Sequence, residues 1–109
     1  MNISIIIPNY NGEELLKKNL PWVFEAAREY KDGEIEIIMV DDASTDKSVQ
    51  TIQNSKFKIQ NDNVKFKIIE NEKNLGFSST VNRGVEEAHG GIVVLLNTDV
   101  APERYFLKP

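Results

Sequence analysis

The chain has 109 residues, enough for one domain with a single core or for part of a larger protein. It contains no cysteine, which excludes disulfide bonds and thiolate metal sites and is typical of a reducing compartment. The net charge of −4 argues against a nucleic-acid partner, whose binding needs clustered lysine and arginine. The sequence shows no basic leader and no apolar run near the roughly 20 residues of a membrane span, so we expect a soluble, cytoplasmic chain.

The first predicted strand covers residues 3–7, a run of β-branched side chains that Pro8 is expected to end because proline has no N–H for a sheet ladder. A helix then begins at Glu13, with Asn11 as its cap. Because Pro21 interrupts the helical pattern, we expect a break or kink near Asn19 and a restart with Pro21 in the first turn.

The second predicted strand covers residues 34–40, and a helix follows with Ser44 or Thr45 as its cap. This helix is expected to fade by residue 55. The polar segment 56–63 is predicted to be a loop.

Residues 64–69 alternate between apolar and polar side chains, so this third strand should lie at the sheet edge with one face in solvent. The last helix is predicted over residues 77–89, with Val81, Val85 and Ala88 turned inward and His89 in a structural role. The aromatic residues assigned to the core are Trp22, Phe24, Phe66 and Phe77.

The last strand is the aliphatic run 92–96, which lacks polar alternation and is therefore expected to be buried on both faces. Strands and helices alternate, which predicts an α/β, Rossmann-like parallel sheet with flanking helices and strand order 3-2-1-4. The last residues predict the start of a further helix, with Pro102 at its first position. We therefore expect residues 1–109 to form a single domain that is the amino-terminal portion of something larger.

Strand order 3-2-1-4 reverses the direction of winding between strands one and four, and open parallel sheets bind ligands at such points. Three carboxylates meeting there would repel one another, so we expect a divalent cation among them, Mg²⁺ or Mn²⁺, held by oxygen ligands. Because magnesium is usually shared with substrate phosphates, a nucleotide diphosphate is the expected partner. The polar strand ends that should converge are Pro8, Asn9, Tyr10, Asp41, Asp42, Asn97, Thr98 and Asp99.

Each of these residues also has a purely structural interpretation. Asp41, Asp42 and Asn97 could satisfy backbone donors in strand-to-helix turns. Against this, Tyr10 is suited to stack on a base, Asp42 to accept from a base or ribose donor, and Asp99 to bind a cation. The chain has neither a Walker-type phosphate loop nor a Gly-x-Gly-x-x-Gly sequence after its first strand.

Four blocks of sequence resemble the family-2 glycosyltransferases of the GT-A fold, in that family's order: residues 5–11, 36–46, 71–84 and 95–99. The resemblance implies an inverting transfer of a sugar from a UDP- or dTDP-sugar to a hydroxyl of a glycan, lipid or protein acceptor. It also implies a divalent cation on the diphosphate, and it is compatible with membrane association of a longer protein.

By position, the resemblance implies that Pro8, Tyr10 and Asp42 line the nucleoside pocket, that Asp41 supports it and that Asp99 holds the metal. Asn97 replaces the first acid of the family's Asp-x-Asp motif; an amide can bind a ribose hydroxyl but is a poorer cation ligand. The catalytic base is expected beyond Pro109, so this chain should bind the donor without the usual base. Self-association is expected if apolar surface is left exposed.

Three other function classes remain open. The chain could be a non-catalytic nucleotide-binding module, since no residue matches the family's base. A phosphoacceptor switch domain gathers acids after strands one and three, where this chain has Pro8 and Glu70. A nucleotidyltransferase usually has a glycine-rich basic loop after strand one, and residues 9–12 lack the basic residue.

Overall fold

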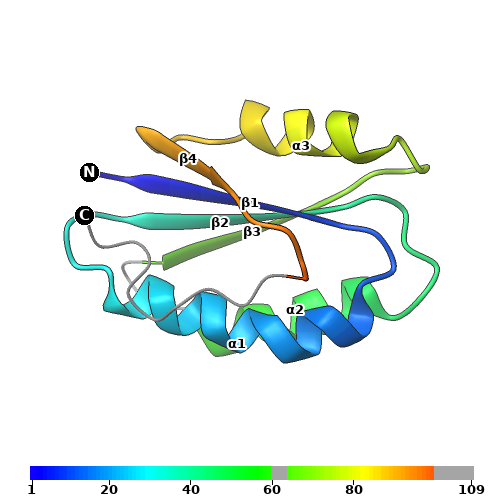
Figure 1. Cartoon of the computed structure of the whole chain (residues 1–109), viewed down its shortest axis with the longest axis horizontal. Helices are drawn as coiled ribbons and strands as arrows, with labels where there is room; N and C mark the ends of the chain where they lie inside the picture. Colours follow the sequence, from blue (N-terminus) through cyan, green and yellow to red (C-terminus); the bar gives the residue numbers. More distant parts are fainter. Residues whose placement is uncertain (60–63, 100–109) are drawn as a thin grey trace.

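The computed structural model describes residues 1–59 and 64–99, which form a parallel sheet between two layers of helices (Figure 1). The sheet has the order β3-β2-β1-β4, which confirms the predicted fold class and strand order. Its strands are β1 (Ile3–Asn9), β2 (Ile35–Asp41), β3 (Val64–Glu70) and β4 (Ile92–Leu95). The helices are α1 (Glu13–Glu29), α2 (Ser48–Ile59) and α3 (Phe77–Glu86). The predicted helix at Pro102 lies outside the described residues.

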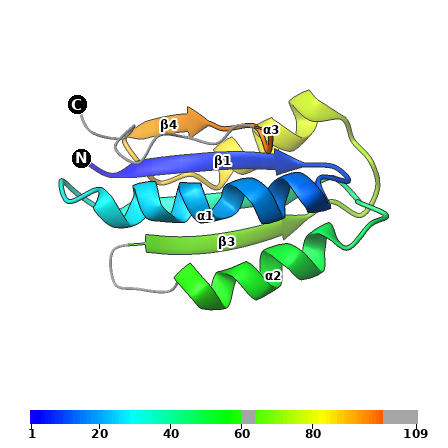
Figure 2. The same ribbon diagram turned by 60° about the horizontal axis from the view of Figure 1, so that its bottom comes forward.

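Helices α1 and α2 cover one face of the sheet and α3 covers the other (Figures 1 and 2). Alternate residues of each strand point to opposite faces, so the core has two parts. The larger part lies under α1 and α2 and includes the edge-to-face pair of Phe24 and Phe66, whose ring centroids are 5.7 Å apart. The smaller part lies on the α3 face and contains Ile6, Ile38 and Val40.

Helix α3 lies close to the sheet because Gly84 has no side chain. A Cβ at this position would lie 2.6 Å from Cγ2 of Ile6 and 3.1 Å from Cγ2 of Val40. Any larger residue would therefore have to lift the helix or displace the strands. The glycine thus sets the height of α3 above the carboxyl ends of the strands.

Strand β1 extends through Pro8 to Asn9, so the predicted end at Pro8 is wrong. Successive residues of a strand direct their backbone groups alternately to the two neighbouring strands. The Ile6 carbonyl accepts the N–H of Leu96 on the β4 side, and Pro8 points to that same side, beyond the end of β4 at Leu95. The missing N–H of proline therefore costs no ladder bond.

Helix α1 runs through Pro21 without a break, so the predicted break and restart are wrong, whereas the alternative of a kink near Asn19 stays a prediction. Proline removes one hydrogen bond of the helix and leaves the carbonyl of Lys17 without its usual donor. Both Pro21 and Lys17 are exposed, so the freed carbonyl lies where water can reach it.

The predicted start of α1 at Glu13 is confirmed, but its predicted cap and the predicted start of α2 are wrong. The Asn11 side-chain oxygen accepts the N–H of Thr45 at 2.7 Å and makes no capping bond to α1. Helix α2 begins later than predicted, at Ser48, whose N–H donates to the carboxylate of Asp46 at 2.9 Å. The same helix continues through residue 59, into the segment 56–63 that we predicted to be a loop.

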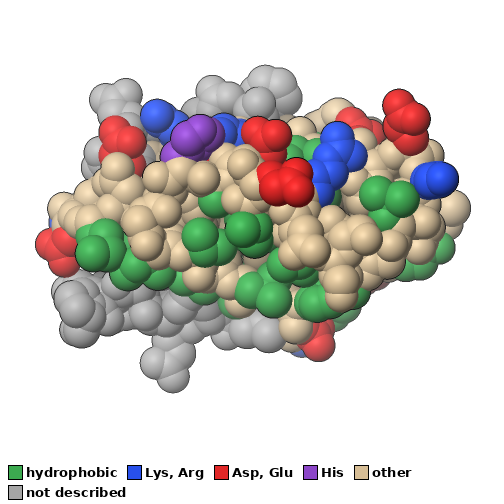
Figure 3. Space-filling view, turned by 90° about the horizontal axis from the view of Figure 1, so that it is seen from above, with side chains coloured by type: hydrophobic (Ala, Val, Ile, Leu, Met, Phe, Trp, Pro, Cys, Tyr) green, Lys and Arg blue, Asp and Glu red, His purple; other side chains and the backbone are tan. Residues whose placement is uncertain are grey.

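Strand β4 is the largest departure from prediction. Ile92, Val93 and Leu95 are each 44–47% exposed, although this aliphatic run predicted burial on both faces. The strand occupies a sheet edge in the described part of the chain, with β1 on one side only. Figure 3, which looks onto the α3 side, shows hydrophobic side chains at the molecular surface. Three further residues predicted to be inside are exposed: Trp22, Phe77 and Val85.

A buried ion network lies at the amino-terminal edge of the sheet, away from the polar strand ends. The carboxylate of Glu36 accepts hydrogen bonds from the Ser4 hydroxyl at 2.6 Å, the Lys67 ammonium at 2.8 Å and the backbone N–H of His89 at 2.9 Å. Burial alone would raise the pKa of Glu36, but these bonds outweigh burial and lower the pKa from 4.5 to about 2. His89 lies beyond the end of α3, not in its last turn as predicted, and it helps hold β4 to the sheet.

None of the helices in the described ranges combines the length and apolar character that crossing a bilayer would require.

Candidate nucleotide-sugar site

A pocket of about 510 Å³ lies at the carboxyl-terminal ends of the strands. Its walls come from the end of β1, the β2 to α2 turn, the loop into α3 and the segment after β4. It includes five of the six predicted site residues, and Asp41 is the one that does not line it. The lining residues are Pro8, Asn9, Tyr10, Asp42, Asn74, Gly76, Phe77, Thr80, Asn97, Thr98 and Asp99.

Asp42 is buried and joins the end of β2 to the loop before α3. Its carboxylate accepts the backbone N–H groups of Leu75 at 2.7 Å and Gly76 at 3.0 Å, together with the side-chain amide of Asn71 at 2.9 Å. Burial opposes ionisation, but these donors outweigh it and lower the pKa of Asp42 below its usual value. The pocket therefore has a fixed, negatively charged acceptor in its wall.

Asp41 is directed into the turn between β2 and α2 instead of into the pocket. Its carboxylate accepts the Asn9 amide at 2.8 Å and the Ser44 hydroxyl at 2.7 Å. The Ser44 N–H also donates to Asp41, at 2.9 Å, so this serine braces the turn and does not cap α2 as one prediction had it. Ala43, which lies between Asp41 and Ser44 in this turn, has φ 58°, a left-handed backbone conformation that residues other than glycine rarely adopt. The hydrogen bonds of Asp41 to Ser44 stabilise the turn in this conformation.

Two aromatic rings lie at the pocket, one of which sequence reasoning missed. Tyr10 is 54% exposed and was predicted to stack on a base, whereas Phe77 is 58% exposed and was assigned to the core. Phe77 is the first residue of α3 and follows Gly76, which has φ 91°. A Cβ atom placed on Gly76 would have no other atom within 4 Å, so the chain is open at this point. The sequence did contain a sign that Phe77 is exposed, because it begins a helix directly after a glycine, and the first residue of a helix need not pack against the sheet.

Arg83 is an exposed residue of α3 that does not line the pocket. Its guanidinium donates to the side-chain oxygen of Asn71 at 2.7 Å. Asn71 in turn donates to Asp42 and, at 3.1 Å, to the hydroxyl of Thr80. The arginine therefore orients the amide that supports Asp42.

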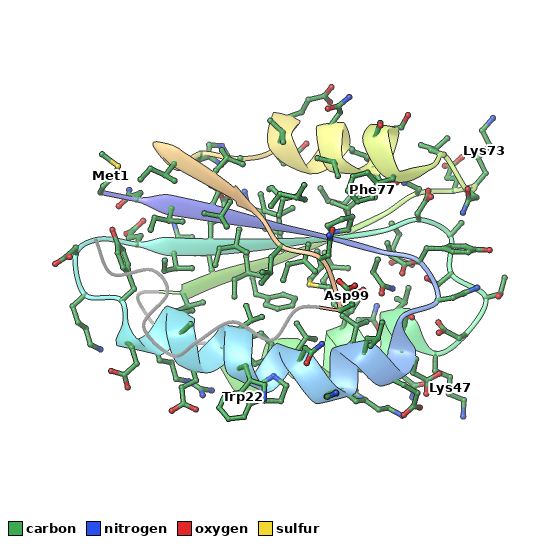
Figure 4. The ribbon with its side chains drawn as sticks, viewed as in Figure 1. Met1, Trp22, Lys47, Lys73, Phe77 and Asp99 are labelled. Carbon is green, nitrogen blue, oxygen red and sulfur yellow. The ribbon has the colours of Figure 1, made fainter. Side chains whose placement is uncertain are left out.

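The expectation of three carboxylates around one cation is wrong. No group of three acidic or histidine side chains suited to a metal ion occurs in residues 1–59 and 64–99. Asp41 faces its own turn and Asp42 is occupied by amide donors. Of these three aspartates, only Asp99 presents an exposed carboxylate without a hydrogen bond to the rest of the described chain, and it lies beyond the end of β4 (Figure 4). One such carboxylate fits a cation whose other ligands are water and substrate phosphates.

The family model for Glycosyl transferase family 2 matches residues 4–109. The chain belongs to glycosyl transferase family 2. This confirms the resemblance drawn from the four sequence blocks, and it argues against the phosphoacceptor switch and nucleotidyltransferase alternatives. The α/β sheet of the family-2 chain is accordingly the amino-terminal portion of a GT-A fold.

Individual family-2 relatives agree with this assignment. The chain is 35% identical over 103 residues to a dolichol-phosphate mannosyltransferase of Pyrococcus furiosus, a match that covers 92% of this chain and 26% of that protein. The relatives that it matches are much longer, and this chain spans about a third of their length or less.

Solved structures show the same fold. The chain superposes on TarS of S. aureus in complex with UDP-GlcNAc with a TM-score of 0.84 and 26% identity, covering 99% of this chain and 29% of TarS. It also superposes on the mannosyltransferase PcManGT of Pyrobaculum calidifontis, in complex with GDP-Man and Mn²⁺, with a TM-score of 0.85 and 25% identity. That match covers 96% of this chain and 30% of PcManGT.

Proposed function

We propose that this chain is the donor-binding part of an inverting glycosyltransferase that moves a sugar from a nucleotide-diphosphate sugar to an acceptor hydroxyl. The observation that carries the proposal is the shared pocket, in which an exposed aromatic ring, the ionised Asp42 and the exposed Asp99 meet at one sheet edge. Family membership and the nucleotide-sugar complexes of TarS and PcManGT support it.

The nucleoside is proposed to lie between Tyr10 and Asp42, beside Pro8. The Tyr10 ring offers a stacking surface for a base, and each stacked base is worth about 1–3 kcal/mol in other proteins. Asp42 is a charged acceptor, which suits the imide N–H of uracil or thymine. UDP- and dTDP-sugars are therefore the proposed donors, with Asp41 supporting the turn that presents Asp42.

Asp99 is proposed to hold Mg²⁺ or Mn²⁺ together with the diphosphate, and Asn97 to hydrogen-bond a ribose hydroxyl. A cation bound there would offset the negative charge that develops on the departing diphosphate oxygen. The presence of Mn²⁺ beside GDP-Man in the PcManGT complex supports the proposal that a divalent cation takes part in donor binding.

In the proposed reaction the acceptor oxygen attacks the anomeric carbon from the side opposite the diphosphate. A new carbon–oxygen bond forms, the bond to the diphosphate breaks with its electron pair, and the hydroxyl proton passes to a base. We propose that this base lies beyond Pro109. The acceptor is proposed to be a glycan, lipid or protein. The dolichol-phosphate in the name of the P. furiosus relative supports a membrane-associated longer protein, and we propose that its site lies in the cytoplasm.

Calorimetric titration of UDP and dTDP, with and without Mn²⁺, tests this proposal. We expect Mn²⁺ to tighten nucleotide binding at least about tenfold, and Asp99→Ala to abolish that gain, a difference of about 1.4 kcal/mol. Asp32→Ala is the matched control, since Asp32 is an exposed aspartate outside the pocket. Equal affinity in all conditions for the unmodified chain and Asp99→Ala would contradict the proposal.

One observation favours a second function, nucleotide binding without turnover. Asp42 and Asp99 are the only carboxylates among the described residues that line the pocket, and both have other proposed roles. Incubation with UDP-GlcNAc and measurement of released UDP separates the two functions. Binding without UDP release, with or without added acceptor, would favour the non-catalytic module for this chain alone.

A further inference from the structure

Asn19 is a buried polar residue on an apolar helix face. It is only 5% exposed and lies on the side of α1 that packs against the sheet, between the buried residues Leu16, Leu20 and Val23. Burying an amide in such surroundings costs free energy unless its hydrogen bonds are made. The partner of Asn19 is therefore informative.

That partner is the backbone of the segment that carries Asp99. The side-chain amide of Asn19 donates to the carbonyl oxygen of Thr98 at 2.8 Å, across 79 positions of sequence. Thr98 is the middle residue between Asn97 and Asp99, and all three line the pocket. One hydrogen bond thus fixes the backbone between Asn97 and Asp99, the two residues proposed to bind the nucleotide-sugar donor.

No other contact in the described chain duplicates this bond. The last ladder bond of the strand is the Leu96 N–H to the Ile6 carbonyl, and the Asn19 bond is the only hydrogen bond that residues 97–99 make within the described ranges. The side-chain oxygen of Asn9, another residue of the pocket, has no hydrogen-bond partner among the described residues and so does not bind this segment. Only the carbonyl of Thr98 is anchored.

We propose that Asn19 is a positioning residue for donor binding, which holds the Thr98 carbonyl so that Asp99 faces the diphosphate and its cation. This inference rests on the proposed function of Asp99. Asn19 itself does not line the pocket. It acts by restricting the segment after β4, which lowers the ordering cost when the cation binds.

The test compares UDP binding with and without Mn²⁺ in the unmodified 109-residue chain and in Asn19→Leu. Leucine has nearly the same size and suits the apolar surroundings, but it has no donor. We expect Asn19→Leu to reduce the Mn²⁺-dependent gain in UDP affinity about tenfold or more. Its affinity for UDP without Mn²⁺ should stay within about twofold of the unmodified chain. Asn19→Gln, which keeps an amide donor, should recover part of the gain and provides the comparison if the leucine variant does not fold.

A merely structural role would produce a different result. Ile35→Val, a small change in the buried start of β2 at the far end of the sheet, is the control for a general loss of stability and should leave the Mn²⁺-dependent gain unchanged. If Asn19→Leu weakens UDP binding equally with and without Mn²⁺, or retains the full gain, the positioning role is overturned while the proposed function stands. If the unmodified chain shows no Mn²⁺-dependent gain, the metal role of Asp99 fails, and this inference fails with it.

Discussion

The backbone N–H of Leu75 donates to Oδ1 of Asp42 at 2.7 Å, which ties the end of β2 to the loop that begins α3. The carboxylate that lines the pocket is thus also the group that holds the pocket's opposite wall. The bond joins two positions 33 residues apart in sequence, so Asp42 contributes to the position of that loop.

Asp42→Asn should lower the free energy of unfolding by about 1–3 kcal/mol, because one side of an amide is a donor and would face the N–H groups of Leu75 or Gly76. Urea denaturation at neutral pH measures this. Asp32→Asn, a change at an exposed aspartate outside the pocket, should have little effect. Identical midpoints for the two variants would show that the loop does not depend on the carboxylate.

Glu36→Gln should reduce stability in a pH-dependent manner. The folded pKa of Glu36 is lowered to about 2, so its contribution is complete above its ordinary value of 4.5 and is lost as the pH falls towards 2. Near neutral pH we expect a loss of about 2 kcal/mol, the usual size for a hydrogen bond to a charged group. Denaturation of both proteins at several pH values checks this, and a difference that stays constant down to the lowest pH would contradict the assignment.

Asn97→Asp should strengthen the response to Mn²⁺. A carboxylate is a better ligand for hard cations than an amide oxygen, and Asn97 lines the same pocket as Asp99. We expect the Mn²⁺-dependent gain in UDP affinity to rise about tenfold, measured by calorimetry. Asn74→Asp, at another position of the pocket lining, controls for added negative charge; an equal rise in both variants would indicate a general electrostatic effect.

The exposed edge of β4 should promote self-association. The β3 edge carries Lys65 and Lys67, whereas the strand at the other edge is wholly aliphatic, and uncharged edges invite pairing with another chain. We expect sedimentation velocity to show dimers that increase with concentration and that Val93→Lys suppresses. Val85→Lys, on exposed α3, is the control; suppression by both variants would locate the contact on the helix face instead of the strand edge.

The arrangement of the sheet could be predicted because it depends on local pattern. The alternation of residues 64–69 placed β3 at an edge, and the polar ends of the strands marked the rim where the pocket lies. The orientation of each aspartate could not be predicted, since Asp41 and Asp42 are identical neighbours that differ only in which side of the strand end they face. The aliphatic run of β4 indicated burial, but a hydrophobic pattern does not identify the segment that would pack against the strand and bury it.

The pocket draws its lining from residues spread between positions 8 and 99, nearly the whole described chain. No fragment of the sheet contains a complete set of walls, so a nucleotide that recognises the pocket binds the native state and has no equivalent target in the unfolded ensemble. Ligand occupancy and cooperative folding are consequently coupled by mass action, at about 2.7 kcal/mol of added stability for ligand at a hundred times its dissociation constant. A shift in melting temperature on addition of each nucleotide would therefore rank candidate donors even before any acceptor is known.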